Sequence, residues 1–252
     1  MKKTAILSTA LCLSLLAAGC TCNGTAPTSE PTATEPSAVI TETETSKETE
    51  EPTAEPANGP HQVTVEIVTL QSSKDGEYKQ VVPNVIVDGK EAMDINNTLS
   101  SYIQKEYPLE IFDDHADGMA THLYWGVKDN VLSIVIFAGE TFTDYYTYDV
   151  FNYDLDTLKG IDNGEAVKSL GMTEEEFISK TSEIVNSYCT DYGYDLEKSL
   201  AAVNLEKCKP FVLPDGTIGV AASIAYPADS QFSGEGTKCF NLATKEPAVF
   251  EQ

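Results

Sequence analysis

The chain has 252 residues, with 40 acidic residues against 16 basic ones, and a formal net charge of −24 at pH 7. A chain this acidic is excluded from binding nucleic-acid phosphates or anionic lipids through its charge. All 16 basic residues are lysine, which excludes a site built on the planar fork of arginine but not one built from lysine and backbone amides.

The N-terminus has the pattern of an export signal. Lys2 and Lys3 precede an apolar run over residues 4–18, and Leu16-Ala17-Ala18-Gly19 leads directly to Cys20. This pattern resembles the lipobox of bacterial lipoproteins, in which the cysteine takes a diacylglycerol and becomes the new N-terminus. The resemblance implies a signal peptide over 1–19, palmitate-type acylation that begins at Cys20, and a lipid-anchored protein on the outer, extracytoplasmic face of the cell membrane.

A membrane-spanning helix and an ordinary secretory signal are two other interpretations of this N-terminus. A membrane-spanning helix needs roughly 20 apolar residues, which is more than this run provides. An ordinary secretory signal has no need for a cysteine directly after Gly19. Both account for the apolar run, but neither accounts for Cys20.

Residues 20–60 form a second region, rich in Thr, Glu and Pro and without any aromatic residue. Such a segment buries too little apolar surface to offset the entropy of an ordered chain. We therefore expect a lipidated cysteine followed by a disordered linker. A stalk that lifts a domain off the membrane is one role for this linker, and a binding tail is the other.

Residues 61–252 are the expected folded part, with 13 lysines, 32 acidic residues and therefore a net charge of −19. Their number fits one domain, or two subdomains over 61–160 and 161–252. The acidity favours a cationic partner, although a general contribution to solubility explains it as well. Three cysteines lie here: Cys189, Cys208 and Cys239. A Cys208–Cys239 bridge and free buried thiols both fit their spacing, and no zinc-binding pattern is present.

Strand patterns dominate the first half of this domain. Residues 62–70 carry β-branched side chains in rough alternation, and residues 78–87 are again extended after a turn. A helix is predicted over 91–105, because apolar residues recur there at helical spacing. Three further strands joined by short turns predict an antiparallel meander. They cover residues 120–127, 131–138 and 145–155.

Helical patterns return in the second half. A short helix is predicted over 163–170, and Thr173 with Glu176 would begin a longer one through a capping box. Asp195 begins a third helix, and a hairpin over 210–226 with a final strand near 238–242 closes the chain. Because strands are grouped with strands and helices with helices, we predict an α+β fold of antiparallel sheets with helices packed on one face.

Several of these segments resemble one known region. The run Asn84-Val85-Ile86-Val87-Asp88-Gly89 before the helix with Ile95-Asn96 is similar to the start of the extracytoplasmic region of RsiV-type anti-sigma factors, which also occurs beside the catalytic domain of the peptidoglycan deacetylase PdaC. The strand over 148–155 with its turn at 157–160, and the hairpin around Leu213-Pro214-Asp215-Gly216, resemble later parts of that region. The resemblance covers most of residues 62–242.

The chain departs from that region in two ways. Phe137-Ala138-Gly139-Glu140 stands where such regions commonly have a glycine-rich segment with a histidine, and the deacetylase catalytic domain is absent. The resemblance implies a wall-facing sensory or binding module. In its RsiV branch it implies binding of lysozyme, a basic protein.

Clustered acidic and histidine residues give the metal candidates. Residues 113–122 hold Asp113, His115, Asp117 and His122, which are ligand types for a divalent metal. The calcium-loop pattern fails because Tyr124 stands where a bidentate glutamate is needed, so a solvated loop is the alternative. The acidic residues around the turn at 154–165 pose the same choice. They would bind calcium, or Asp162 would simply begin the next helix.

Aromatic residues give the binding candidates. Trp125, Tyr145, Tyr146 and Tyr148 would form a platform for stacking sugars, or would be divided between the core and cross-strand pairs. The spacing places Tyr146, Tyr148 and Val150 on one face of their strand.

The sequence therefore predicts a non-catalytic surface lipoprotein that needs no cofactor, because the common nucleophile, zinc-protease and phosphate-loop motifs are absent. Three roles stay open. The first is binding or sensing a cationic protein at the cell envelope. The second is binding a cell-wall glycan. The third is an uncharacterised wall hydrolase that would use His115 or His122 with a carboxylate pair.

Overall fold

The computed structural model describes residues 60–112, 115–141, 146–230 and 234–250. All described residues belong to one compact unit. The predicted signal peptide, Cys20 and the predicted linker up to residue 59 lie outside the described residues.

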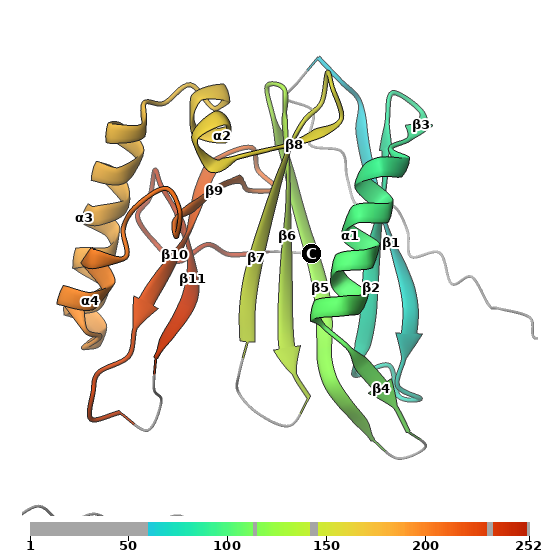
Figure 1. Ribbon diagram of the computed structural model, residues 1–252, viewed down its shortest axis with the longest axis horizontal. Helices are drawn as coiled ribbons and strands as arrows, with labels where there is room; N and C mark the ends of the chain where they lie inside the picture. The colour runs from blue at the N-terminus through green and yellow to red at the C-terminus, as the bar shows by residue number, and fades with distance from the viewer. Residues whose placement is uncertain (1–59, 113–114, 142–145, 231–233, 251–252) are drawn as a thin grey trace, which may run out of the picture. The chain divides into compact units, whose positions relative to one another are not determined.

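A small antiparallel sheet and one helix begin the described chain (Figure 1). The strands are β1 (Val63–Ser72), β2 (Lys79–Val87) and β3 (Lys90–Glu91). The tight turn between β2 and β3 places Asp88 and Gly89 at positive φ, a hairpin geometry that favours Asp-Gly. Helix α1 (Met93–Glu106) packs against β2 and buries Ile95, Leu99 and Ile103. The predicted strands and helix of this region are confirmed.

A five-stranded antiparallel sheet follows, in the order β4-β5-β6-β7-β8. Its strands are β4 (Leu109–Ile111), β5 (Ala116–Lys128), β6 (Val131–Glu140), β7 (Tyr146–Asp154) and β8 (Lys159–Ile161). The predicted meander forms β5 to β7. The strand β6 is buried on both faces, which explains its unbroken apolar sequence.

Three helices and a second small sheet complete the chain. The helices are α2 (Asn163–Ser169), α3 (Glu174–Tyr192) and α4 (Leu196–Ala201). The strands β9 (Lys209–Val212), β10 (Ile218–Ala225) and β11 (Glu235–Asn241) form an antiparallel sheet in the order β11-β10-β9. Asp162 begins α2 through a reciprocal capping box with Glu165. The alternative in which Asp162 starts a helix is therefore the one that the structure adopts.

The start of α3 differs in detail from the prediction. The Thr173 side chain accepts a hydrogen bond from the backbone N–H of Glu176, as expected. The Glu176 carboxylate, however, forms an ion pair with Lys180 at 2.9 Å. Thr173 thus caps the helix, while its partner in the predicted box strengthens the first turn through an i,i+4 pair.

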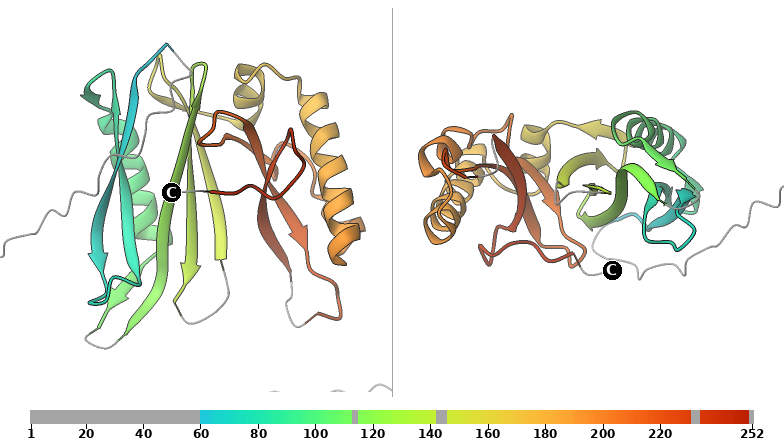
Figure 2. Two further views of the ribbon diagram at one scale, coloured as in Figure 1. Left: turned by 180° about the vertical axis from the view of Figure 1, so that it is seen from behind. Right: turned by 90° about the horizontal axis from the view of Figure 1, so that it is seen from below.

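Alternation along the central strands divides the interior into separate clusters. Leu132, Ile134 and Ile136 of β6 face a core shared with α1, β1 and β2. Val135, on the opposite face of β6, joins a cluster with residues of the C-terminal sheet such as Phe211. A third cluster lies between that sheet and α3. The C-terminal sheet is therefore covered by helices on one face and by the central sheet on the other (Figure 2). The α+β prediction is confirmed.

Buried polar groups join the central sheet to β9. The Ser133 hydroxyl donates a hydrogen bond of 2.6 Å to the side-chain oxygen of Asn152. The side-chain nitrogen of Asn152 donates to the backbone carbonyl of Pro210 at 2.9 Å. The backbone N–H of Val212 donates to the Ser133 hydroxyl at 2.9 Å. Each of these buried groups has a partner, so the contact between the two sheets fixes their relative position without an unpaired polar atom at these residues.

The three domain cysteines are free thiols. Cys189 and Cys208 lie in the cluster beneath α3, whereas Cys239 lies in the cluster that faces the central sheet. Of the two alternatives that the spacing left open, free buried thiols are therefore the one observed, and the Cys208–Cys239 bridge is not formed.

Candidate functional site

The metal candidates do not assemble into a site in the described residues. Asp113 lies outside those residues. The ring of His115 stacks on Phe112 with 4.6 Å between centroids, and Asp117 lies opposite Glu110 at the start of β5. His122 is five residues further along the same strand, roughly 16 Å away. No group of three metal-ligating side chains occurs in the part of the chain that the structure describes.

The acidic residues around the β7–β8 turn are used in local contacts. Asp154 accepts hydrogen bonds from the backbone and hydroxyl of Thr157, at 2.8 and 2.7 Å. Asp162 and Glu165 form the capping box of α2. The calcium alternative therefore finds no support in the described side chains.

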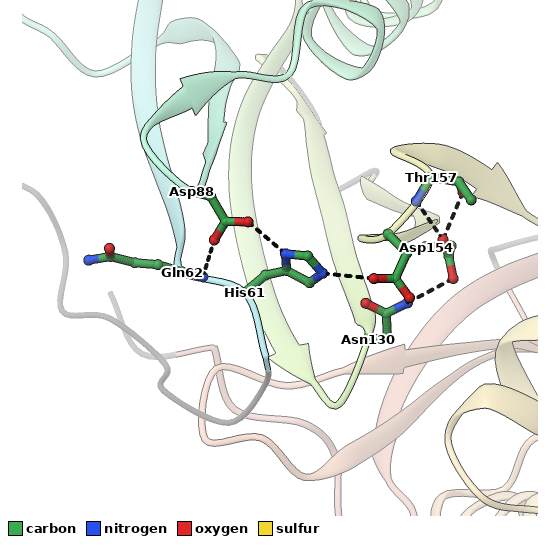
Figure 3. Close-up of polar contacts among 7 residues, drawn as sticks. His61, Gln62, Asp88, Asn130, Asp154 and Thr157 are labelled. Carbon is green, nitrogen blue, oxygen red and sulfur yellow. Dashed lines mark hydrogen bonds and ion pairs between the residues drawn. The ribbon is translucent and has the colours of Figure 1, made fainter.

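A histidine joins this turn to the N-terminal sheet (Figure 3). One ring nitrogen of His61 lies 2.7 Å from a carboxylate oxygen of Asp88, and the other lies 3.1 Å from Asp156. Asn130 donates to both Asp154 and Asp156, at 2.9 and 2.8 Å. We call His61, Asp88 and Asp156 the junction clamp, because they connect two sheets at the first residues after the predicted linker.

A second polar cluster joins α1 to the C-terminal sheet. The Asp149 carboxylate accepts hydrogen bonds from Tyr102 at 2.5 Å and from Tyr107, and it pairs with Lys209 at 3.0 Å. Burial alone would raise the pKa of Asp149, but the two hydroxyls and the Lys209 charge outweigh it and lower that pKa. Burial beside this carboxylate raises the pKa of both tyrosines. The Asp149 carboxylate thus has three partners from neighbouring elements, which is typical of a residue that stabilises the fold.

The predicted aromatic platform divides between two faces of the central sheet. Trp125 packs in the core with α1, with only 9% of its surface exposed. Its ring is therefore not available on the surface. Tyr145 lies outside the described residues. Tyr146 and Tyr148 lie on the face turned toward the C-terminal sheet, and Tyr146 is 37% exposed.

These two tyrosines belong to a larger set of rings on that face, which we call the central aromatic group. Phe137 of β6 lies 5.7 Å from Tyr146 and 5.1 Å from Tyr148, measured between ring centroids. Phe250, near the C-terminus, stacks on Tyr124 at 4.4 Å and lies 5.8 Å from Tyr148. The group consists of His122, Tyr124, Phe137, Tyr146, Tyr148 and Phe250.

A second set of rings surrounds the end of α3, and we call it the helix tyrosine group. Tyr188 lies 4.7 Å from Tyr192 and stacks on Tyr194 at 5.4 Å, and Tyr194 lies 5.8 Å from Tyr226. Tyr192 is 67% exposed, whereas the other three are half-buried. The turn at Gly193, which ends α3 in the left-handed conformation, places Tyr192 and Tyr194 on either side of it.

Lys238 lies where the two groups meet. It belongs to β11, which lies between α3 and β7 in both views (Figures 1 and 2). The Lys238 ammonium is 4.5 Å from the centroid of the Tyr146 ring and donates to its hydroxyl. Tyr188 packs against Phe240, two residues after Lys238 on the same strand, with 5.0 Å between ring centroids. The two groups with Lys238 form one surface, the aromatic strip.

Apart from the Lys238 ammonium, the strip presents aromatic rings and hydroxyl groups. Burial raises the pKa of Tyr148 and of Tyr124 above the usual value of about 10. Burial and the charge of Lys79 lower the pKa of His122, which favours the neutral imidazole. Half-exposed rings bordered by hydroxyl groups suit stacking and hydrogen bonding more than proton transfer.

Two pockets lie apart from the strip's tyrosines. One, of about 160 Å³, lies between the β1–β2 hairpin and β5 and includes His122, Lys79 and Glu77. It offers one carboxylate where a hydrolase of the expected type needs two. The other, of about 430 Å³, lies between the β9–β10 turn and the C-terminal segment. Neither pocket gathers the residues expected for the hydrolase alternative.

Sequence reasoning found Tyr146 and Tyr148 but missed most of the strip. The spacing Tyr188-x₃-Tyr192 is that of one turn of a helix, and Tyr194 follows two residues later, after Gly193. Nothing in the sequence indicates that β11 lies between α3 and β7, because that arrangement depends on how the C-terminal sheet docks on the central one.

Comparison of the chain with protein-family models, with curated proteins and with solved structures finds no match. Among the described residues, no helix combines the length and the apolar character that crossing a bilayer requires. The resemblance to the RsiV and PdaC extracytoplasmic region stays a prediction.

Proposed function

We propose that this protein is a lipid-anchored, non-catalytic binding module on the outer face of the cell membrane, and that its ligand is a glycan of the cell envelope. The signal-like N-terminus ending at Cys20 supports the anchor. Incorporation of labelled palmitate into the wild type, but not into Cys20→Ala, tests it. The resemblance to the wall-facing region of RsiV-type anti-sigma factors supports the same location.

The aromatic strip is the observation that carries the glycan assignment. Sugar rings present apolar faces and polar edges, and half-exposed tyrosines offer both a flat ring and a hydroxyl to them. Tyr146 and Tyr148 lie 6.0 Å apart on the sheet, and Tyr188 and Tyr192 lie 4.7 Å apart at the end of α3. Rings on rigid strands and on a helix lose little entropy on binding, which favours a preformed platform.

The test measures binding of oligosaccharides to the full chain in detergent micelles by calorimetry. Chitohexaose and cellohexaose serve as probes. Replacing Tyr146 with Ala removes an exposed ring and should weaken binding about tenfold, or roughly 1.4 kcal/mol. Tyr78→Ala is the matched control, because Tyr78 is a half-buried tyrosine of the β1–β2 loop and does not belong to the strip. No binding of either sugar to the wild type, or equal losses in both variants, would count against the proposal.

A cationic protein is the second candidate ligand, and the charge of the folded part favours it. Residues 61–252 carry 32 acidic residues against 13 lysines. A field of this sign attracts basic proteins and speeds their encounter. Lysozyme, which the resemblance implies for the RsiV branch, is the natural probe for this alternative.

A further inference from the structure

Lys238 has an unusual position for a lysine of so acidic a domain. It is half-buried on β11, and its ammonium is held against the face and hydroxyl of Tyr146. A cation over an aromatic ring is attracted by the ring's negative face, which restricts an otherwise flexible side chain. The charge is therefore fixed beside Tyr146.

This charge has no acidic partner in the described part of the chain. Among the described residues, no carboxylate oxygen comes within 4.0 Å of the Lys238 ammonium. Other lysines of the domain do form such pairs. They include Lys105, Lys180, Lys198, Lys207, Lys209 and Lys245. Lys90 and Lys159 also have no carboxylate within that distance among the described residues, but both are exposed. Lys238 differs from them because it is half-buried and held against an aromatic ring, where its charge can meet a ligand that stacks on that ring.

We propose that the glycan bound by the aromatic strip carries carboxylate groups, and that Lys238 holds one of them while the tyrosine rings stack on the sugar. The inference rests on the glycan-binding function proposed above. One ammonium matches the single charge of a sugar carboxylate, whereas a phosphate is usually held by several donors at once. The Tyr146 hydroxyl accepts a hydrogen bond from Lys238, so its own O–H can donate to an oxygen of the same carboxylate.

The net charge of the domain sets the conditions of the test. A charge of −19 repels an acidic glycan at low ionic strength. At about 0.15 M salt the Debye length is roughly 8 Å, so the charges near the strip dominate. Binding is therefore compared at that salt concentration.

The experiment uses two oligosaccharides that differ only in the acidic group: cellohexaose and a hexamer of β-1,4-linked glucuronic acid. Calorimetry on the full chain in micelles should give a glucuronate affinity about tenfold above that for cellohexaose. Lys238→Met should remove this preference, so that the variant binds the two hexamers with equal affinity within about twofold. Lys238→Arg should retain most of it. Lys90→Met, which removes an exposed lysine of β3, is the control and should change neither affinity.

The outcomes separate this inference from the function on which it rests. If neither hexamer binds the wild type, both proposals fail. If both bind with equal affinity, the glycan-binding function stands and the acidic preference is wrong. If Lys238→Met weakens both hexamers equally, Lys238 only supports the Tyr146 ring, and its proposed contact with a carboxylate is wrong.

Discussion

His61 contacts carboxylates through both of its ring nitrogens, and only the protonated imidazole can donate from both. Its hydrogen bonds to Asp88 and then Asp156 raise the pKa of His61 above 6.5. The bonds from His61 and the backbone of Gln62 lower the pKa of Asp88 in turn. Each partner therefore favours the charged form of the other.

The pH dependence of the junction clamp follows from the raised pKa of His61 and the lowered pKa of Asp88. A raised histidine pKa gives stability that is fully present below about pH 6.5 and is lost as the pH rises through the folded-state pKa. A lowered aspartate pKa gives stability that is present above about pH 4 and is lost as the pH falls through its folded-state value. The clamp is thus strongest between about pH 4 and pH 6.5.

We predict that His61→Gln lowers the melting temperature by about 1–3 °C at pH 5.5, and by less at pH 9, where the wild-type imidazole is neutral. The effect is small because Asp88 and Asp156 are more than half exposed. His115→Gln is the control, since His115 lies outside the clamp. Thermal unfolding followed by circular dichroism provides the measurement, and an equal loss at both pH values would contradict the prediction.

At the scale of elements, Gly126 sets how closely β5 approaches β9. A β-carbon at this position would lie 2.3 Å from the carbonyl oxygen of Leu213 and 2.5 Å from that of Val212. Both are backbone atoms, so a larger residue cannot be accommodated by rotating a side chain. Glycine at this position therefore allows the central sheet and the C-terminal sheet to dock.

We predict that Gly126→Ala lowers the free energy of unfolding by about 1–3 kcal/mol. Gly139→Ala on the neighbouring strand is the matched control, because a β-carbon there meets only the Phe137 ring at 3.7 Å. Urea denaturation of both variants measures the difference. If both variants lose the same free energy of unfolding, the close approach of β5 and β9 does not explain the effect and the prediction is wrong.

The elements that the sequence predicted are those with a long local pattern. Residues 62–70 and 131–138 show alternating or continuous apolar character, and α3 shows a clear inner face. The strands β4 and β8 were missed because each has three residues, too few for a pattern. Alternation also placed Tyr146 and Tyr148 on one face.

Contacts between distant segments could not be predicted in this way. Trp125 faces the core because it lies opposite Ile134 in the β5–β6 register, and that pairing is not visible in either strand alone. The helix tyrosine group joins the strip only because β11 lies between α3 and β7. Both facts depend on docking between elements that are far apart in the sequence, so half of the candidate site was not predictable.

At the scale of the whole molecule, the excess of acidic residues predicts salt-sensitive association with basic proteins. Hen lysozyme should bind the full chain in micelles at about 20 mM salt, and its affinity should fall at least tenfold by about 300 mM, because screening shortens the reach of the field. An acidic protein of similar size is the control and should not bind. Surface plasmon resonance at several salt concentrations gives the affinities. Absence of lysozyme binding at the lowest salt would remove support for the cationic partner.

The free thiols have a practical consequence for the intact protein. Cys189, Cys208 and Cys239 are at most 6% exposed and form no bridge. Folding of this domain therefore does not require an enzyme that forms disulfides, and a reductant should not unfold it. A maleimide reaches these three sulfurs only when the interior of the folded domain opens. The rate of alkylation therefore reports how often that opening occurs.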